Sequence, residues 1–416
     1  MITIIVNKYD RLKLHFFIAN KINNQAQGTF SQTIHKVAIT SIAVGILSLL
    51  LSFMILGGFY KIISEKIFSF GGQLLITKYT YSNSFENTSF LVNDTLLEVL
   101  ETEEYINNFQ SFAFKAGLLK TKEEVQGVVF KGVDHQFDTT FFSSNMVQGR
   151  FPILKSNGYT VEVLLSTKIA NTLKLDIGDE VLIYFVQNPP RYRNLIVTGV
   201  YETGLEDFDD KFIIGDLNLV RRINDWNSNQ VGGVEVFISP GKKISESQST
   251  LFNQVASDLY VESIEQKYLQ LFDWLSLLNR NVYIFLTLIL LVASFSMVSI
   301  LLILIMERTN MIGILKSLGA NNYTIRKIFF VSGAQLLIKG LFWGNSIGLG
   351  LALIQFYFKI IPLDQENYYM DSVPINFDFW VIIGVNFLTC LLIGLSFFIP
   401  ISIINRIEPI QAVRFD

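Results

Sequence analysis

The residue types that usually perform catalysis or bind metals are scarce in this chain and lie far apart. Cys390 is the single cysteine and lies in an apolar run, which excludes an intramolecular disulfide and a cysteine-based zinc site. His15, His35 and His135 are too few and too scattered for a histidine-rich metal site. The sequence therefore predicts no metal chemistry.

Nucleotide-binding and hydrolase motifs are missing as well. The pair Gly241-Lys242 cannot belong to a G-x-x-x-x-G-K-[ST] loop, because Val236 stands where the first glycine should be and Lys243 replaces the hydroxyl residue. No H-E-x-x-H motif occurs, and the single match to G-x-S-x-G, Gly344 to Gly348, lies inside a predicted membrane span, where the strand-to-helix turn of the hydrolase motif cannot form. We therefore expect no catalytic residue, no cofactor and no enzyme activity in this chain.

The composition indicates a membrane protein. Of the 416 residues, 50% are hydrophobic and only 17% are charged. The mean hydropathy of +0.40 is higher than a soluble domain with one core requires. The formal net charge is -3 and no dense Lys/Arg cluster occurs, so we expect no nucleic-acid partner.

Four apolar runs are long enough to cross a hydrocarbon core, which takes roughly 20 helical residues. They predict transmembrane helices 1, 2 and 4 at 37–60, 281–306 and 379–404. Transmembrane helix 3 is predicted within 328–358, where residues before Lys339 form turns at the membrane surface and residues 340–358 cross the membrane. The first run follows a mixed polar segment and is longer than the apolar core of a signal peptide, so we expect a retained anchor.

Residues 61–280 contain no long apolar run and are predicted to form a separate domain. We expect a hairpin of strands at 180–186 and 194–201, a strand at 234–238, and helices at 94–104 and 247–261. The expected fold class is an α-helical membrane protein with four transmembrane helices plus a large α+β domain inserted between helices 1 and 2.

The Lys and Arg residues in the short flanking segments predict the orientation. They are enriched in the amphipathic N-terminal segment 1–36 and in the segment 307–327, whereas the connection 359–378 and the large domain are acidic. Because basic flanks stay in the cytoplasm, we place 1–36, 307–327 and the tail 405–416 inside, and the large domain and the loop 359–378 outside.

The segment ERTNMIGILKSLGA, residues 307–320, has the spacing of an amphipathic helix that leaves the second span. Its apolar face is predicted to contain Met311, Ile314, Leu315 and Leu318, and its small or polar face Asn310, Gly313, Lys316, Ser317 and Ala320. An ordinary turn at the membrane surface and a partner-binding helix both fit this pattern. Gly319 should end the helix, and Asn321 or Asn322 should begin the next.

This segment, followed by IRKIFF, resembles the coupling helix of ABC transporter permeases of the FtsX/MacB/LolC/LolE type. Residues 164–185 with 194–209 are similar to the periplasmic core of that family, 363–377 to its last outer loop, and 399–416 to its C-terminal ending. The YYMDSVPI loop and residues 292–302 resemble the lipoprotein-releasing LolC/LolE branch. The resemblance implies that the inserted domain is periplasmic and that the protein lies in the bacterial inner membrane.

The resemblance also implies function and partners. It implies a permease that extracts lipoproteins toward a periplasmic carrier, with mechanical transmission of force from a separate LolD-like ATPase dimer, which would bind ATP and Mg. A second permease subunit, the same or homologous, membrane lipids and a LolA-like carrier are the other expected partners. The residues expected to couple to the ATPase are Glu307, Arg308, Ile312, Gly313, Lys316, Gly319 and Ala320.

Two surfaces are expected to contact the lipoprotein or its carrier. The predicted acyl-chain cavity is lined by Leu50, Phe53 and Met54 of the first span and by Phe285, Leu288 and Phe295 of the second. The LolC-type hook that docks the carrier would correspond to the short tip 187–194, where Pro189, Pro190, Arg191 and Arg193 form either a stiff basic finger or an ordinary hairpin turn.

Two other functions are compatible with the same sequence features. An FtsX-like regulator of a periplasmic cell-wall hydrolase and a MacB-like efflux component both have this general plan.

Gly340, Gly344 and Gly348 recur at every fourth position, the small-residue pattern that lets membrane helices approach closely. Lys339 is expected to extend its ammonium toward the membrane surface.

Overall fold

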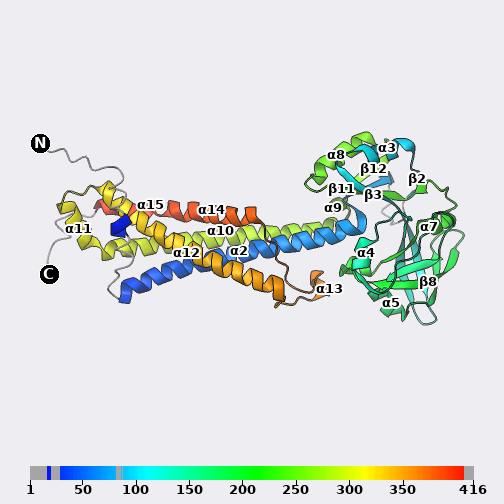
Figure 1. Ribbon diagram of the computed structural model, residues 1–416, viewed down its shortest axis with the longest axis horizontal. Coiled ribbons are helices and arrows are strands. Elements are labelled where there is room, and N and C mark those ends of the chain that lie inside the picture. The colour runs from blue at the N-terminus through cyan, green and yellow to red at the C-terminus, as the bar shows by residue number, and fades with distance from the viewer. Residues whose placement is uncertain (1–15, 20–28, 81–85, 87, 407–416) are drawn as a thin grey trace. The chain divides into compact units, whose positions relative to one another are not determined.

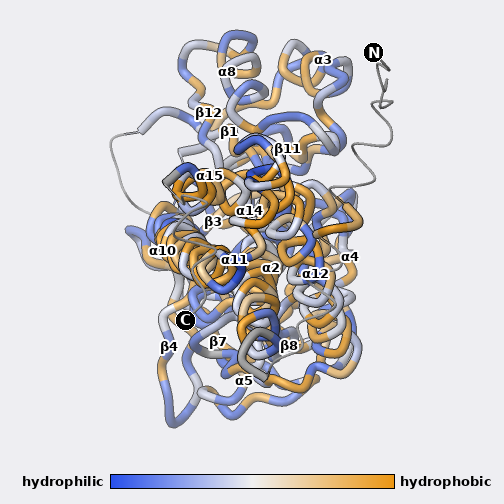
Figure 2. Tube along the Cα trace, turned by 90° about the vertical axis from the view of Figure 1, so that its left-hand side faces the viewer, coloured by the Kyte–Doolittle hydropathy of each residue, from blue (hydrophilic) through white to orange (hydrophobic). Residues whose placement is uncertain are grey.

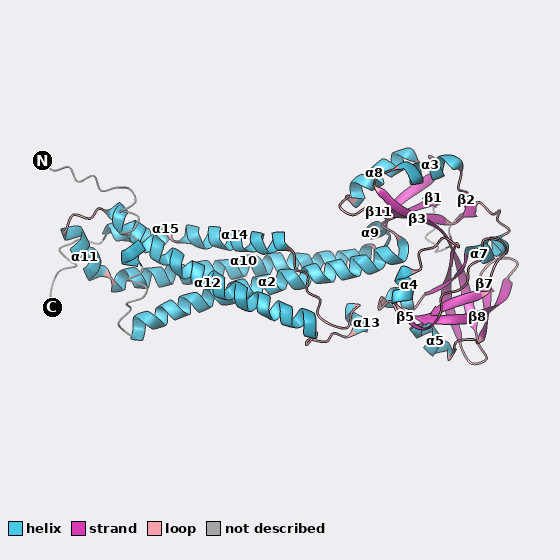
Figure 3. Cartoon of the chain, viewed as in Figure 1, coloured by secondary structure: helices cyan, strands magenta, loops and turns pink. Residues whose placement is uncertain are grey.

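The computed structural model describes residues 16–19, 29–80, 86 and 88–406, which divide into two compact units. Within the described residues, the helical unit comprises residues up to 60, 275–362 and 372 onward, and the large domain comprises 61–274 and 363–371. Most of the predicted N-terminal segment 1–36 and of the tail 405–416 lies outside the described residues. Figure 1 labels the elements, and Figure 3 shows that the strands belong to the large domain.

The helical unit contains the four long apolar helices that the sequence predicts. In Figure 2, α10, α12 and α14 are coloured mostly as hydrophobic. Each helix is long enough to cross a bilayer, so the prediction of four membrane-spanning helices with one large inserted α/β domain is confirmed. Its helices are α2 (Thr29–Gly71), α10 (Leu269–Glu307), α11 (Thr309–Ser317), α12 (Asn322–Phe358), α14 (Phe379–Ser396), α15 (Phe398–Ser402) and the 3-10 helix η1 (Ile403–Arg406).

Two of these helices extend well beyond their apolar runs. Helix α2 has 43 residues and α10 has 39, so at about 1.5 Å per residue each is much longer than the ~30 Å hydrocarbon core. The last turns of α2 and the first turns of α10 belong to the large domain. The apolar run therefore predicts the span but misses the continuation of the helix into the domain.

The glycine stripe of α12 packs against α2. A Cβ atom on Gly340 would lie 2.6 Å from Cβ of Ile42, and one on Gly344 would lie 2.8 Å from the carbonyl oxygen of Ala43. Such approaches leave no room for a side chain, so the predicted close contact between helices is confirmed.

Replacing Gly344 with leucine is therefore expected to destabilise the helical unit by about 1–3 kcal/mol, because the new side chain pushes α2 and α12 apart. Gly350→Leu on the same helix is the matched control, since no described atom lies within 4 Å of its added Cβ. The measurement is the melting temperature of the purified protein in detergent. Equal melting temperatures for the two variants would contradict the packing assignment.

The large domain is built on one sheet of ten strands, part of which closes on itself. Strands β3, β4, β9, β6, β8 and β7 pair in a ring, in which β4 with β9 and β6 with β8 are parallel. Strands β12, β1 and β11 continue from β3 as an open antiparallel extension. The buried residues of the ring and the extension form one hydrophobic core.

The strands follow one another along the chain with short helices between them. The strands are β1 (Leu74–Lys78), β2 (Phe90–Leu91), β3 (Ile106–Lys120), β4 (Val125–Val133), β5 (Met146–Gly149), β6 (Glu162–Ser166), β7 (Glu180–Phe185), β8 (Arg191–Tyr201), β9 (Phe212–Asp216), β10 (Gln230–Val231), β11 (Gly233–Ile238) and β12 (Leu259–Ser263). The helices are α3 (Asp94–Thr102), α4 (Thr140–Ser144), α5 (Thr167–Leu173), α6 (Glu206–Asp209), α7 (Leu217–Asn224), α8 (Ile244–Gln254), α9 (Ile264–Lys267) and α13 (Gln365–Tyr368).

The predicted local elements of the large domain are mostly present. The hairpin is β7 with β8, the strand at 234–238 is β11, and the helix at 94–104 is α3. The prediction of one helix over 247–261 is wrong in its second half. Helix α8 ends before Val255, which is extended, and residues 259–263 form β12 because they pair with β1 at the edge of the sheet.

Candidate functional site

The turn between α10 and α12 is a short helix packed against the rest of the helical unit. Ile312 is fully buried, and Gly313 is buried beside it. Ile312 belongs to the same core cluster as residues of α10, α12 and α15, and the Lys316 ammonium donates to the carbonyl oxygen of Ile404 at 3.0 Å. Helix α11 is therefore fixed to the helices on both sides of it.

The exposed surface of α11 differs from the predicted one. Of the predicted small or polar face, Gly313 packs inward and Lys316 bonds to the chain itself, whereas Asn310 and Ser317 are exposed. Ile314 is 54% exposed and Leu318 is 79% exposed, and Glu307 and Asn310 are exposed as well. The surface that a partner can reach thus includes two large apolar side chains.

The ends of α11 follow the predicted capping pattern. Gly319 adopts a positive φ of 88°, which glycine tolerates best, and follows the end of α11. The side chain of Asn321 accepts a hydrogen bond from the Thr324 amide at 2.8 Å and begins α12. Arg308 stands at the N-cap of α11, and Ala320 packs against the core cluster. The turn therefore has a defined geometry.

The six residues predicted to line one lipid cavity do not share one exposed surface of this chain. Leu50 and Met54 are buried in the helical unit, where Leu50 packs with Leu290 of α10. Phe53 is half-buried and its ring lies 6.0 Å from the ring of Tyr283. Only the residues from α10 remain on the surface.

The outward face of α10 is strongly apolar and exposed. Phe285, Leu288 and Phe295 are more than half exposed, with Phe295 at 68%. Leu50 and Met54 of the first span are covered by other helices of the unit, whereas these three α10 side chains are not.

The tip of the β7–β8 hairpin is held against helix α7. The Arg191 guanidinium pairs with the Asp225 carboxylate at 2.5 Å and donates to the carbonyl oxygen of Ile223 at 2.6 Å. Asp225 raises the pKa of Arg191 through this hydrogen-bonded pair. Of the two alternatives left open by the sequence, this contact favours the ordinary hairpin turn, because the Arg191 side chain caps the end of α7.

The rest of the hairpin tip is open to solvent. Pro189 and Pro190 are exposed, and Arg193 is half-buried and bonds to the neighbouring carbonyl oxygen of Tyr192. Leu118, Tyr184 and Tyr192 lie opposite one another on β3, β7 and β8, and all three are exposed. We did not predict this apolar row from the sequence, although Tyr184 and Tyr192, which lie on either side of the predicted turn, were a usable signal.

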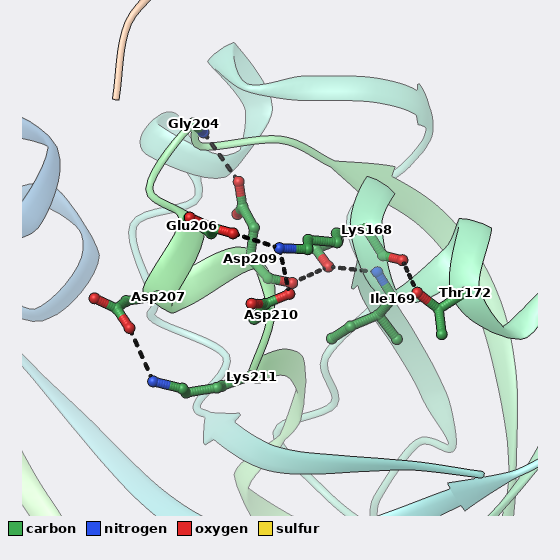
Figure 4. Close-up of polar contacts among 10 residues, drawn as sticks. Lys168, Ile169, Thr172, Gly204, Glu206, Asp207, Asp209, Asp210 and Lys211 are labelled. Atoms are coloured by element: carbon green, nitrogen blue, oxygen red, sulfur yellow. Dashed lines mark hydrogen bonds and ion pairs between the residues drawn. The ribbon is translucent and has the colours of Figure 1, made fainter. Parts of the chain in front are cut away.

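A second polar site lies around the loop between β8 and α6, shown in Figure 4. The buried Asp209 carboxylate accepts a hydrogen bond from the Gly204 amide at 3.0 Å, drawn in Figure 4. It accepts another from the Thr203 hydroxyl at 2.9 Å. Lys168 pairs with Glu206 and Asp210, both at 2.8 Å. Burial raises the pKa of Asp209, and its hydrogen bonds oppose that shift. These groups are paired with one another, so the arrangement fixes the loop.

This loop is also tied to α2 and to the segment 363–371. The Lys66 ammonium donates to the carbonyl oxygens of Thr203, at 2.6 Å, and Tyr369, at 2.9 Å. One side chain of α2 thereby joins two segments that are far apart in the sequence. The sequence contains no signal for this contact, because Lys66 lies in a mixed segment without a motif.

Metal-binding geometry is absent from the described part of the chain, where no group of three or more His, Cys, Asp or Glu side chains could hold an ion.

Comparison with known families accounts for this architecture. The family model for the MacB-like periplasmic core domain matches residues 37–251, just over half of the chain. The model for the FtsX-like permease C-terminal region matches residues 283–409. The chain belongs to the ABC transporter permeases of the FtsX/MacB/LolC/LolE type. The two matched regions of this permease correspond to α2 through α8 and to α10 through η1.

Curated relatives of the permease match nearly its full length. It is 24% identical over 412 residues to the lipoprotein-releasing system transmembrane protein LolC of Neisseria meningitidis serogroup B, which covers 93% of this chain and 95% of the relative. It is 23% identical over 398 residues to the LolE protein of Haemophilus influenzae, covering 91% and 94%. The resemblance stated from the sequence is confirmed.

Proposed function

We propose that this permease extracts lipoproteins from the inner membrane and passes them toward a periplasmic carrier, with ATP hydrolysed by a separate cytoplasmic ATPase dimer. The LolC and LolE relatives are lipoprotein-releasing permeases, which supports this substrate class. The observation that carries the proposed mechanism is the continuity of α2 and α10, which run without interruption from the helical unit into the large domain. A continuous helix transmits displacement along its axis, because every turn is hydrogen-bonded to the next.

The proposed ATPase-binding element is the exposed surface of α11. Ile314 and Leu318 offer apolar side chains to a partner, while buried Ile312 and the bond from Lys316 hold the helix to α12 and η1. A displacement of α11 would thus move the helices it packs against. We assign Glu307, Arg308, Gly319 and Ala320 to the ends of this element and Gly313 to its packing.

Lipoprotein contact is proposed for two exposed surfaces. The α10 face with Phe285, Leu288 and Phe295 would receive acyl chains, and a second permease subunit would close the path on the opposite side. The hairpin tip with Pro189 and Pro190 would face the carrier, because it presents apolar groups while Arg191 keeps the hairpin in place.

The orientation is proposed from the basic flanks. A cysteine introduced as Asn227→Cys, at an exposed site of the large domain, should react with a membrane-impermeant thiol reagent in spheroplasts. Asn322→Cys, exposed at the start of α12, should not react until the membrane is permeabilised. Both variants carry Cys390→Ala. Labelling at position 322 in intact spheroplasts would invert the orientation.

The transport assignment is tested by reconstitution. The permease and its ATPase are placed in proteoliposomes that carry a triacylated lipoprotein, and release to a soluble carrier is measured with and without ATP. We expect ATP-dependent release that requires both subunits. The absence of release, combined with stimulation of a cell-wall hydrolase, would favour the regulatory function instead.

A further inference from the structure

A fully buried ion pair lies in the large domain between β4 and β11. The Lys131 ammonium and the Glu235 carboxylate are 2.7 Å apart, and their side chains are 0% and 1% exposed. Strand β3 lies between their strands, so the lysine reaches across it. Buried ion pairs of this kind contribute little net stability, because desolvation offsets their attraction. The pair therefore needs an explanation other than stability.

The second contact of Lys131 is with the end of α2. Its ammonium donates a hydrogen bond to the carbonyl oxygen of Phe70, in the last turn of the helix. Carbonyl groups there lack intrahelical partners and lie at the negative end of the helix dipole. The Phe70 ring packs among the rings of Phe142, Phe208 and Phe212, and lies 4.5 Å from the ammonium. Lys131 thus joins the end of α2 to the sheet.

The first turns of α10 and the short helix α9 before it contact the end of α2 and the residues just after it. The Ile264 amide donates to the carbonyl oxygen of Gln73 at 3.0 Å, and the rings of Phe68 and Phe272 stack at 6.2 Å. Lys267, the last residue of α9, is partly buried; burial lowers its pKa, and the charges of Glu262 and Glu235 oppose that shift. A Cβ atom on Gly71, in the last turn of α2, would lie 3.3 Å from Ile264 and 3.7 Å from the Glu235 carboxylate, so the segment before α10 and Glu235 meet the same turn.

The burial of Glu235 costs free energy of folding. Among the described residues, its Oε2 atom has no hydrogen-bond partner, and neither does the side-chain amide of Gln110, which lies directly opposite it on β3. Leaving buried polar atoms unpaired destabilises a fold. An apolar pair at positions 131 and 235 would avoid this cost but would lose the bond to α2.

We propose that Glu235 is a positioning residue, which holds Lys131 on the last turn of α2, so that movement of this membrane helix is transferred to the large domain. This inference rests on the proposed mechanical function. It assigns a role to a buried charge that the transport proposal leaves unused.

The test compares the double variant Lys131→Met with Glu235→Met against wild type in the reconstituted full complex. We expect the melting temperature and basal ATP hydrolysis to be retained, because apolar replacement of a buried pair is tolerated. Lipoproteins released per ATP hydrolysed should fall by about tenfold. Hydrogen exchange of the Gly72 amide, which bonds to the Phe68 carbonyl oxygen at the end of α2, should become faster.

The control is the double variant Arg150→Met with Glu162→Met. It removes a second ion pair of the same domain, 2.7 Å long, that includes no residue of α2 or α10. Its release ratio and Gly72 exchange should match wild type. If the first variant does not fold, the double variant Lys131→Gln with Glu235→Gln replaces it, since the two amides keep a donor and an acceptor but remove both charges.

The outcomes separate the two proposals. A wild-type complex that releases no lipoprotein defeats the transport proposal, whereas Gly72 exchange still tests the anchoring of α2. The role of Glu235 is overturned by a different result: the wild-type complex releases lipoprotein, and the variant without the charges shows the same release per ATP and the same Gly72 exchange rate. Equal losses in the control pair would overturn it as well.

Discussion

Replacing both Ile314 and Leu318 with aspartate is expected to weaken ATPase binding by about a hundredfold or more, because exposed apolar anchors dominate such interfaces. Both side chains are exposed on α11, so the permease should still fold and insert. The measurement is co-purification of the ATPase with the permease, followed by a binding titration in detergent.

Two controls make this result specific. Leu91→Asp changes an equally exposed apolar residue in the large domain and should leave ATPase binding intact. Ile312→Asp changes a fully buried residue of the same helix and should reduce the amount of permease in the membrane. Wild-type affinity in the Ile314 and Leu318 double variant would show that the ATPase binds elsewhere.

The second large effect is expected at the outward face of α10. Phe295→Gln should reduce lipoprotein release by about tenfold, because an acyl chain would then bury an amide that has no partner. ATP hydrolysis without substrate should continue, since Phe295 does not contribute to the helical core.

Phe387 provides a close control for that variant. It lies on α14 and is 67% exposed, against 68% for Phe295, so Phe387→Gln makes the same chemical change on another outward face. Only the Phe295 variant should lose release. Equal loss in both would indicate a general effect of a polar group at the lipid surface, and undiminished release in both would exclude this face as the acyl path.

The four spans were predictable because length and hydrophobicity alone define them, and the β7–β8 hairpin because Gly178-Asp179 and the two prolines bracket its strands. The face that each helix buries was not. Helix α2 is apolar nearly all round in its span, so periodicity cannot show that Leu50 and Met54 turn inward. The burial of Gly313 could not be predicted for a related reason, because tertiary contacts with α12 and α15 decide which side of α11 is covered.

Long-range pairing was also beyond the sequence. The ring of strands closes through the parallel pairs β4–β9 and β6–β8, whose members are separated by other elements. No local turn signals such a pairing. The contact of Lys131 with Glu235 depends on another long-range pair, β3 with β11, so a single sequence offers two ordinary charged residues and no indication that they meet.

Strand β3 has a consequence for how the large domain unfolds. Its first half pairs with β11 of the open extension, its second half pairs with β4 and β7 of the ring, and fully buried Phe112 pairs with residues of both. Neither part can detach without breaking hydrogen bonds of this one strand. The extension and the ring should therefore melt in a single cooperative transition, and a force applied to either is resisted by the whole domain.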